Sequence, residues 1–170
     1  STVLANQVAA GKVRLPEFQE YVEYVVDFLE ELPGEVVIER LCGQLVQKSP
    51  TWALVDVHGV GYGLSISVAT FARLPAAGEQ VRLYTQLHVR EDRVALFGFH
   101  DEPEREMFRL LIGVPGIGPH LAQTVLSGMA LDDLAAALYQ GRVGELTCIK
   151  GIGRKTAERM ILDLRDKVAP

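Results

Sequence analysis

The chain has 170 residues, of which 48% are hydrophobic and 23% are charged, and its formal net charge is −5 at pH 7. This composition is ordinary for a folded protein with a buried core, and the length suits one or two small domains. No stretch approaches the about 18 consecutive apolar residues that span a membrane. Residues 1–11 lack the basic start and long apolar run of a secretory signal. We therefore expect a cytoplasmic protein that does not cross a membrane.

The cysteine and histidine pattern argues against metal and disulfide chemistry. Cys42 and Cys148 are far apart in the sequence, and neither belongs to a CxxC pair. The histidines are scattered without metal-ligand spacing. Free or buried thiols in a reducing compartment are the expected state, with no metal and no cofactor.

The charge is distributed unevenly. Residues 1–35 hold seven acidic and two basic side chains, whereas residues 36–170 hold 15 of each sign. Within that neutral body, residues 141–170 carry seven basic against four acidic side chains. The acidic total therefore comes from the N-terminal segment, and a basic C-terminal stretch leaves nucleic acid open as a partner.

Residues 1–36 are predicted to contain one helix. Pro16 lies where a first helical turn tolerates proline, and Pro33 with Gly34 ends the segment. Between them runs an apolar stripe of roughly helical spacing: Tyr21, Val22, Val25, Val26, Phe28, Leu29 and Leu32. The stripe indicates packing rather than chemistry.

From residue 36 the apolar pattern becomes strand-like. Strand signals cover residues 36–41, 45–46, 52–57, 62–68, 80–89 and 93–99, with turn residues at 48–50, 58–61, 74–79 and 91–92. So many short strands in so short a segment suit a small closed barrel, because closure removes exposed sheet edges. We predict a five-stranded barrel of the oligonucleotide-binding type (OB-fold) over residues 37–100.

The remainder, residues 101–170, is predicted to be an all-α domain. Asp101 or Glu102 can cap a first helix that runs to Ile112. Further helices are expected over residues 119–129, 131–139, 143–146 and 155–168. The predicted order is thus an N-terminal helix, a β barrel and a helical domain.

One pattern occurs twice in the helical part. Gly116-Ile117-Gly118 and Gly151-Ile152-Gly153 each join two predicted helices. The glycines permit a sharp turn, and the isoleucine can be buried between the helices. The second helix then begins with unpaired backbone N–H groups, which form a site for a phosphate oxygen. Such contacts are indifferent to base sequence.

The alternative interpretation of each turn is purely structural, as a helix end followed by a turn. Two turns with matched flanks favour paired phosphate-binding hairpins instead. Arg154, Lys155 and Arg159 follow the second turn and add positive charge there.

These turns resemble tandem helix-hairpin-helix motifs, and residues 37–168 as a whole resemble the RuvA family of bacterial Holliday-junction-binding proteins. The resemblance rests on Ile38-Glu39-Arg40-Leu41-Cys42-Gly43, Val57-His58-Gly59-Val60-Gly61-Tyr62, Val89-Arg90-Glu91-Asp92, Phe97-Gly98-Phe99, Leu126-Ser127-Gly128-Met129 and Gly151-Ile152-Gly153-Arg154-Lys155-Thr156-Ala157-Glu158-Arg159. It implies a homotetramer that holds four-way DNA junctions open and flat in recombination and repair. It also implies a partner, the RuvB motor, that supplies the ATPase, so that the chain itself is not an enzyme.

The resemblance also implies residue roles. Glu91 and Asp92 match an acidic pin that faces the junction crossover and repels phosphates. The hairpin residues that would hold the DNA arms are Gly116, Gly118, His120, Gly151, Gly153, Arg154, Lys155 and Arg159. Family members usually have lysine where this chain has His120, so that contact should be weaker or pH-dependent.

Two departures from the family pattern shape the expectations. The family continues into a C-terminal domain that contacts RuvB, whereas this sequence stops at Pro170. We therefore expect junction binding without motor-driven branch migration.

Residues 1–36 do not resemble RuvA. Residues 20–41 are faintly similar to the C-terminal part of a radical-SAM family, although the three clustered cysteines for an iron–sulfur cluster are absent. A recombined chain, an upstream misread start and a native extension are the alternatives.

Rival functions remain open at this point. A DNA-repair enzyme would need a catalytic acid or lysine after a hairpin, and Glu158, Asp163 and Asp166 are better explained as a solvated helix face. A recombined chain acting mainly as a protein-interaction or folding scaffold, with weak DNA binding, is the other alternative. Charge reversal at Arg154 and Lys155 separates these interpretations.

Overall fold

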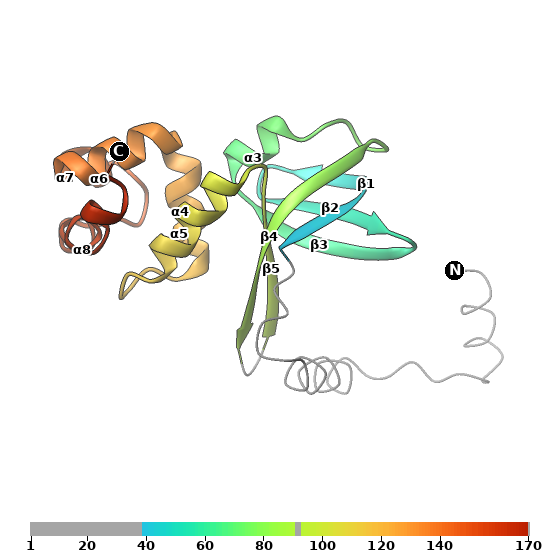
Figure 1. Cartoon of the computed structure of the whole chain (residues 1–170), viewed down its shortest axis with the longest axis horizontal. Coiled ribbons are helices and arrows are strands. Elements are labelled where there is room, and N and C mark those ends of the chain that lie inside the picture. The colour runs from blue at the N-terminus through green and yellow to red at the C-terminus, as the bar shows by residue number, and fades with distance from the viewer. Residues whose placement is uncertain (1–38, 91–92, 170) are drawn as a thin grey trace.

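The computed structural model describes residues 39–90 and 93–169, and shows a β barrel and a helical part lying end to end (Figure 1). The helix expected within residues 1–36 and the acidic pair Glu91 and Asp92 lie outside the described residues. The barrel followed by a helical domain confirms the fold predicted from the sequence.

Five strands close the barrel in the order β1-β2-β3-β5-β4. They are β1 (Arg40–Ser49), β2 (Trp52–Val57), β3 (Val60–Ile66), β4 (Gln80–Arg90) and β5 (Arg93–Phe99). All pairs are antiparallel except β3 with β5, where Ser65 lies opposite Phe97 and the parallel pairing closes the barrel. Alternate residues of the strands point inward to form its core: Leu41, Leu45, Ala53, Val55, Leu64, Ile66, Val81 and Leu83.

The strand predicted over residues 62–68 is wrong at its end, because a short helix, α3 (Val68–Arg73), begins there. β3 ends at Ile66, and Ser67 begins the helix because its hydroxyl accepts a hydrogen bond from the Thr70 backbone N–H at 2.9 Å. A serine N-cap satisfies one of the open donors of a first helical turn. Val68 is thus the first residue of a helix, although its β-branched side chain extends the alternating strand pattern.

The helical part contains five helices and a short 3-10 turn among the described residues. They are α4 (Glu102–Ile112), α5 (Pro119–Gly128), α6 (Leu131–Gln140), α7 (Val143–Leu146), α8 (Arg154–Leu164) and η1 (Arg165–Lys167). Asp101 is the residue that caps α4, accepting a hydrogen bond from the Glu104 N–H at 3.0 Å. The last predicted helix ends earlier than expected, at Leu164, where the chain tightens into η1.

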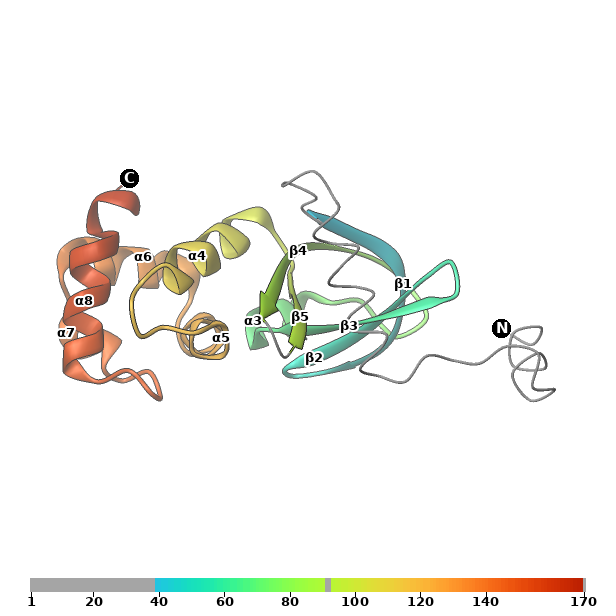
Figure 2. The same cartoon turned by 90° about the horizontal axis from the view of Figure 1, so that it is seen from below.

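The end of β5 belongs to the hydrophobic core of the helical part, and a buried polar contact also joins the barrel to that part. Phe97 and Phe99 at the end of β5 pack on Phe108 of α4, with ring centroids 5.0 and 4.9 Å apart. The buried Glu104 carboxylate accepts hydrogen bonds from the hydroxyls of Ser67 and Thr70, the latter at 2.7 Å. Figure 2 shows α3 and α4 on the side of the barrel that faces the other helices. These contacts fix the orientation of α4, which leads into the first glycine turn.

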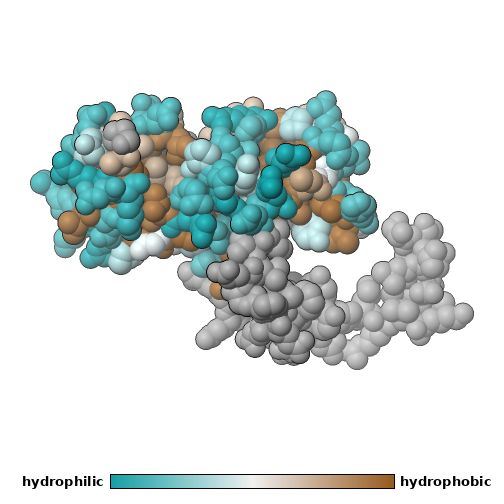
Figure 3. Space-filling model, in the orientation of Figure 1, coloured by the Kyte–Doolittle hydropathy of each residue, from teal (hydrophilic) through white to brown (hydrophobic). Residues whose placement is uncertain are grey.

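Hydrophilic residues cover much of the face shown in Figure 3, with smaller hydrophobic areas between them. Within the described residues, no single helix is long and apolar enough to cross a membrane.

Candidate nucleic-acid interface

The two glycine turns have almost the same backbone geometry. Gly116 and Gly151 adopt φ values of +94° and +89°, a region that side chains other than glycine rarely adopt. Gly118 and Gly153 precede α5 and α8 with φ/ψ of −84°/169° and −86°/168°. The repeat seen in the sequence is therefore a repeat of structure.

The isoleucines anchor both turns. Ile117 and Ile152 are each 4% exposed. The N–H of Ile117 donates to the Val114 carbonyl at 3.0 Å, and the N–H of Ile152 donates to the Ile149 carbonyl at the same distance. The flanking glycines of both turns are exposed, so burial of the isoleucine leaves the glycine backbone facing outward.

The glycines that begin α5 and α8 leave their helix N-termini open. Among the described residues, no side chain caps the first N–H groups at Gly118 or Gly153. A Cβ added at either position would have no described heavy atom within 4 Å, and neither φ is positive. Neither internal packing nor backbone strain therefore demands glycine at these two positions. Open N–H groups at a helix start, with no side chain over them, suit a phosphate that approaches the backbone closely.

The positive side chains are concentrated on the second hairpin. Arg154 and Lys155 are exposed at the start of α8, and Arg154 Nε lies 2.9 Å from the Glu158 carboxylate. Lys150, which was not among the predicted contacts, is also exposed, directly before Gly151. The sequence signal that could have identified Lys150 is its position directly before the second Gly-Ile-Gly turn. The Glu158 contact shows that part of the Arg154 charge is already neutralised within α8.

Arg159 joins the two hairpins. Its Nη1 donates a hydrogen bond to the Pro115 carbonyl in the first turn at 3.2 Å. The hairpins also touch through Gly151, where an added Cβ would stand 3.0 Å from Leu121 Cδ1. The structure therefore brings the predicted glycines and cations onto two adjoining turns, with Arg159 between them.

His120 lies apart from the cations. It is exposed on α5 at the position that Lys155 holds on α8, and its ring makes an edge contact with Phe97 at a centroid distance of 6.1 Å. The side chain therefore lies against the end of β5, between the first hairpin and the barrel. α5 itself contains no lysine or arginine.

A closed five-stranded barrel that carries tandem hairpins with open helix N-termini defines a class of backbone-directed nucleic-acid-binding proteins. Family comparison agrees with this class. Residues 38–98 match the model described as RuvA N terminal domain, and residues 108–166 match the SAM-like helix-hairpin-helix tandem.

Three similar relatives share the name Holliday junction branch migration complex subunit RuvA. The relative from Nitrosomonas europaea is 48% identical over 134 residues, which are 79% of this chain and 69% of the relative. Those from an Acidovorax species and Ralstonia nicotianae are 48% and 50% identical over 132 residues, 78% of this chain and 70% and 68% of the relatives. The chain belongs to the RuvA family.

Proposed function

We propose that this chain binds four-way DNA junctions as a non-catalytic subunit, in keeping with its relatives' name, Holliday junction branch migration complex subunit. The observation that carries the proposal is the pair of matched hairpins, each with an uncapped glycine at the start of its second helix. Two phosphate sites fixed relative to each other suit a rigid duplex arm better than a small ligand. This geometry favours DNA binding over the scaffold interpretation.

The proposed contacts are electrostatic and do not read bases. Backbone N–H groups near Gly116, Gly118, Gly151 and Gly153 would bind phosphate oxygens of an arm. Arg154, Lys155 and Arg159 would add charge on the second hairpin, with His120 as a weaker contact on the first. Affinity should then fall steeply as salt rises, because phosphate binding releases counterions.

Selectivity for a junction over a linear duplex would come from assembly. We propose a homotetramer in which each subunit holds one arm, with Glu91 and Asp92 as the acidic pin at the crossover. A cytoplasmic RuvB-type motor would supply ATP hydrolysis. The proposed division of the chain is a non-family extension over residues 1–36, a barrel over 37–100 and a DNA-binding domain over 101–170.

A gel-shift titration tests the proposal, with a synthetic four-way junction and a linear duplex of the same sequence. Size-exclusion chromatography with light scattering measures the assembly in parallel. The expected result is a strong junction preference from a particle of four subunits. A monomer that binds both DNAs equally would overturn the proposal.

A further inference from the structure

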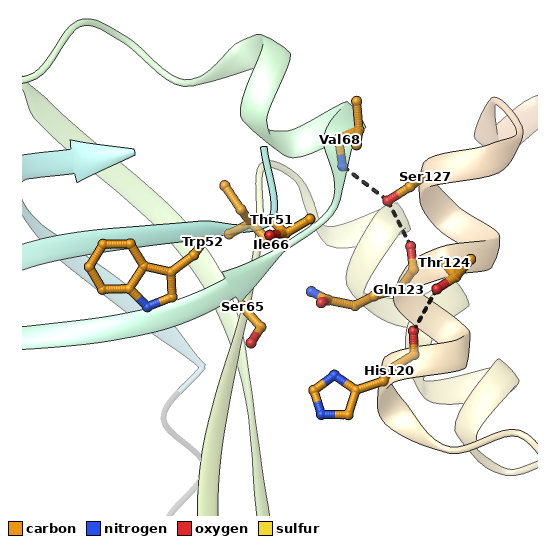
Figure 4. Close-up of a pocket in the computed structure, with 9 residues that line it drawn as sticks. All are labelled: Thr51, Trp52, Ser65, Ile66, Val68, His120, Gln123, Thr124 and Ser127. Atoms are coloured by element: carbon orange, nitrogen blue, oxygen red, sulfur yellow. Dashed lines mark hydrogen bonds between the residues drawn. The ribbon is translucent and has the colours of Figure 1, made fainter. Parts of the chain in front are cut away.

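A groove separates the barrel from α5, and the hairpin chemistry does not account for it. Its volume is about 570 Å³, within the size range of small-molecule sites. Figure 4 shows Gln123 and His120 extending from α5 toward Ser65 on β3, with Trp52 on the barrel side and its ring turned away from α5. The groove is formed by segments that are far apart in the sequence.

Gln123 supplies an unsatisfied hydrogen-bonding group in this groove. The residue is 8% exposed, and its Nε2 has no hydrogen-bond partner among the described residues. Its backbone carbonyl is occupied, because it accepts from the Ser127 hydroxyl at 2.8 Å. A buried amide without a partner costs free energy, so a ligand atom that accepts this hydrogen bond would be favoured.

The lining of the groove indicates the chemistry of the ligand. It consists of neutral hydroxyl, amide and apolar side chains with one histidine, and within the described part of the chain no lysine, arginine, aspartate or glutamate contributes. A phosphate would find no fixed counter-charge in this lining, whereas a neutral planar group with hydrogen-bonding edges would find the Gln123 amide, the Ser65 hydroxyl and the His120 ring. Proteins bind unstacked bases by hydrogen bonds to the base edges and by stacking on aromatic rings, including histidine.

The position of the groove relates it to the first hairpin. His120 lines the groove and is the second residue of α5, two residues after Gly118. A strand whose phosphate binds the open N-terminus of α5 would therefore have its adjacent base within reach of the groove. We propose that this groove accepts an unpaired nucleobase from a DNA strand held at the first hairpin. The inference rests on the proposed function, since that hairpin must bind DNA.

A paired duplex cannot use this site. The amide of Gln123 is buried, and the base edges of a duplex remain inside its grooves, so only a base that has left the stack can reach it. The groove would thus favour DNA with an extrahelical nucleotide over fully paired DNA of the same sequence.

The test compares two duplexes that differ by one extrahelical 2-aminopurine nucleotide, and uses the full chain. The bulged duplex should bind at least about fivefold more tightly than the paired one, the lower end of measured base–aromatic contacts. The 2-aminopurine fluorescence should change on binding as the base leaves water. Gln123→Leu keeps the side-chain volume, and Ser65→Ala changes the opposite wall. Each should reduce the advantage of the bulge while leaving paired-junction affinity unchanged.

Failure of this inference is distinguishable from failure of the proposed function. Equal affinity for the two duplexes, with junction preference intact, would overturn the groove proposal alone. Unchanged bulge preference in both variants would also overturn it. So would a change in the oligomeric state of either variant, because the groove would then be an interface with a second copy of the chain. Loss of all DNA binding in the parent chain would overturn both proposals. Lys155→Glu, in the second hairpin, is the matched control. It should lower the affinity for both duplexes by the same factor.

Discussion

Arg159 of α8 donates a hydrogen bond to the carbonyl oxygen of Pro115, 44 residues earlier, at 3.2 Å. The contact crosses from the second hairpin to the turn of the first. It places a guanidinium beside the hairpin whose following helix, α5, has no lysine or arginine of its own. Arg159 thus has a structural contact in addition to its proposed electrostatic role.

Replacing Arg159 should therefore affect both folding and binding. We expect Arg159→Ala to lower the free energy of unfolding by about 1 kcal/mol, the usual net value of one hydrogen bond, and to weaken DNA binding. Lys155→Ala should weaken DNA binding with little change in stability, because Lys155 is exposed. Urea denaturation and DNA titration of both variants measure the difference. Equal stability of the two variants would show that the Pro115 contact contributes nothing.

Because the N-terminus of α8 is uncapped, a substitution at Gly153 should change stability and DNA affinity in opposite directions. Serine is a good N-cap residue, so Gly153→Ser should stabilise the protein by about a few tenths of a kcal/mol. The same hydroxyl would cover the N–H groups offered to phosphate, so DNA affinity should fall. Thermal denaturation and DNA titration should thus move in opposite directions. Unchanged affinity would argue against phosphate binding at this helix start.

Gly151 is the matched control for that experiment. Its φ of +89° disfavours any side chain, and an added Cβ would stand 3.0 Å from Leu121 Cδ1. Gly151→Ala should therefore destabilise the protein by about 1–2 kcal/mol. A stable Gly151→Ala protein would mean that the turn can relax and that the two glycines do not differ in role.

Removing the ion pair within α8 should strengthen DNA binding. Arg154 Nε lies 2.9 Å from Glu158, and the two side chains are 84% and 51% exposed. Glu158→Gln removes the competing carboxylate and one negative charge beside the hairpin. Affinity for DNA should rise by about two- to threefold, in line with the small worth of exposed ion pairs. Weaker binding of this variant at low salt would contradict the proposed role of Arg154.

The buried Glu104 carboxylate is predicted to hold the barrel and α4 together. Glu104→Ala leaves the Ser67 and Thr70 hydroxyls without their acceptor and should cost about 3 kcal/mol of unfolding free energy. Glu106→Ala, on the same helix, removes a half-exposed carboxylate paired with Arg109 at 3.2 Å and Arg105 at 3.7 Å, and should cost at most about 1 kcal/mol. Similar unfolding midpoints for both variants would refute this role.

Much of this architecture could be predicted because local signals carry it. The Gly-Ile-Gly turns require glycine at Gly116 and Gly151 for backbone reasons, so the hairpins are visible in the sequence. Alternating apolar residues indicate the strands because a closed barrel buries one face of each. The order of the two parts follows from the change from strand-like to helical spacing near residue 100, whereas the resemblance to a known family supplied the roles of single residues.

The remaining features depend on contacts between distant segments. The parallel pairing of Ser65 with Phe97 and the hydrogen bond from Arg159 to Pro115 have no local signal. The sequence did not reveal α3 because Val68 continues a strand-like alternation. The residue that caps the helix is a single serine, Ser67, whose hydroxyl also donates a hydrogen bond to the distant Glu104. The groove at Gln123 arises only where α5 docks on the barrel.

The most direct test of the central claim is a charge reversal at the start of α8. Arg154→Glu and Lys155→Glu together should greatly weaken four-way junction binding. They should also reduce the slope of log affinity against log salt by about 0.9 for each phosphate that the variant no longer neutralises. Circular dichroism would establish that the variant is folded. Junction affinity and salt slope equal to those of the parent chain, in a folded protein, would contradict DNA binding through these hairpins.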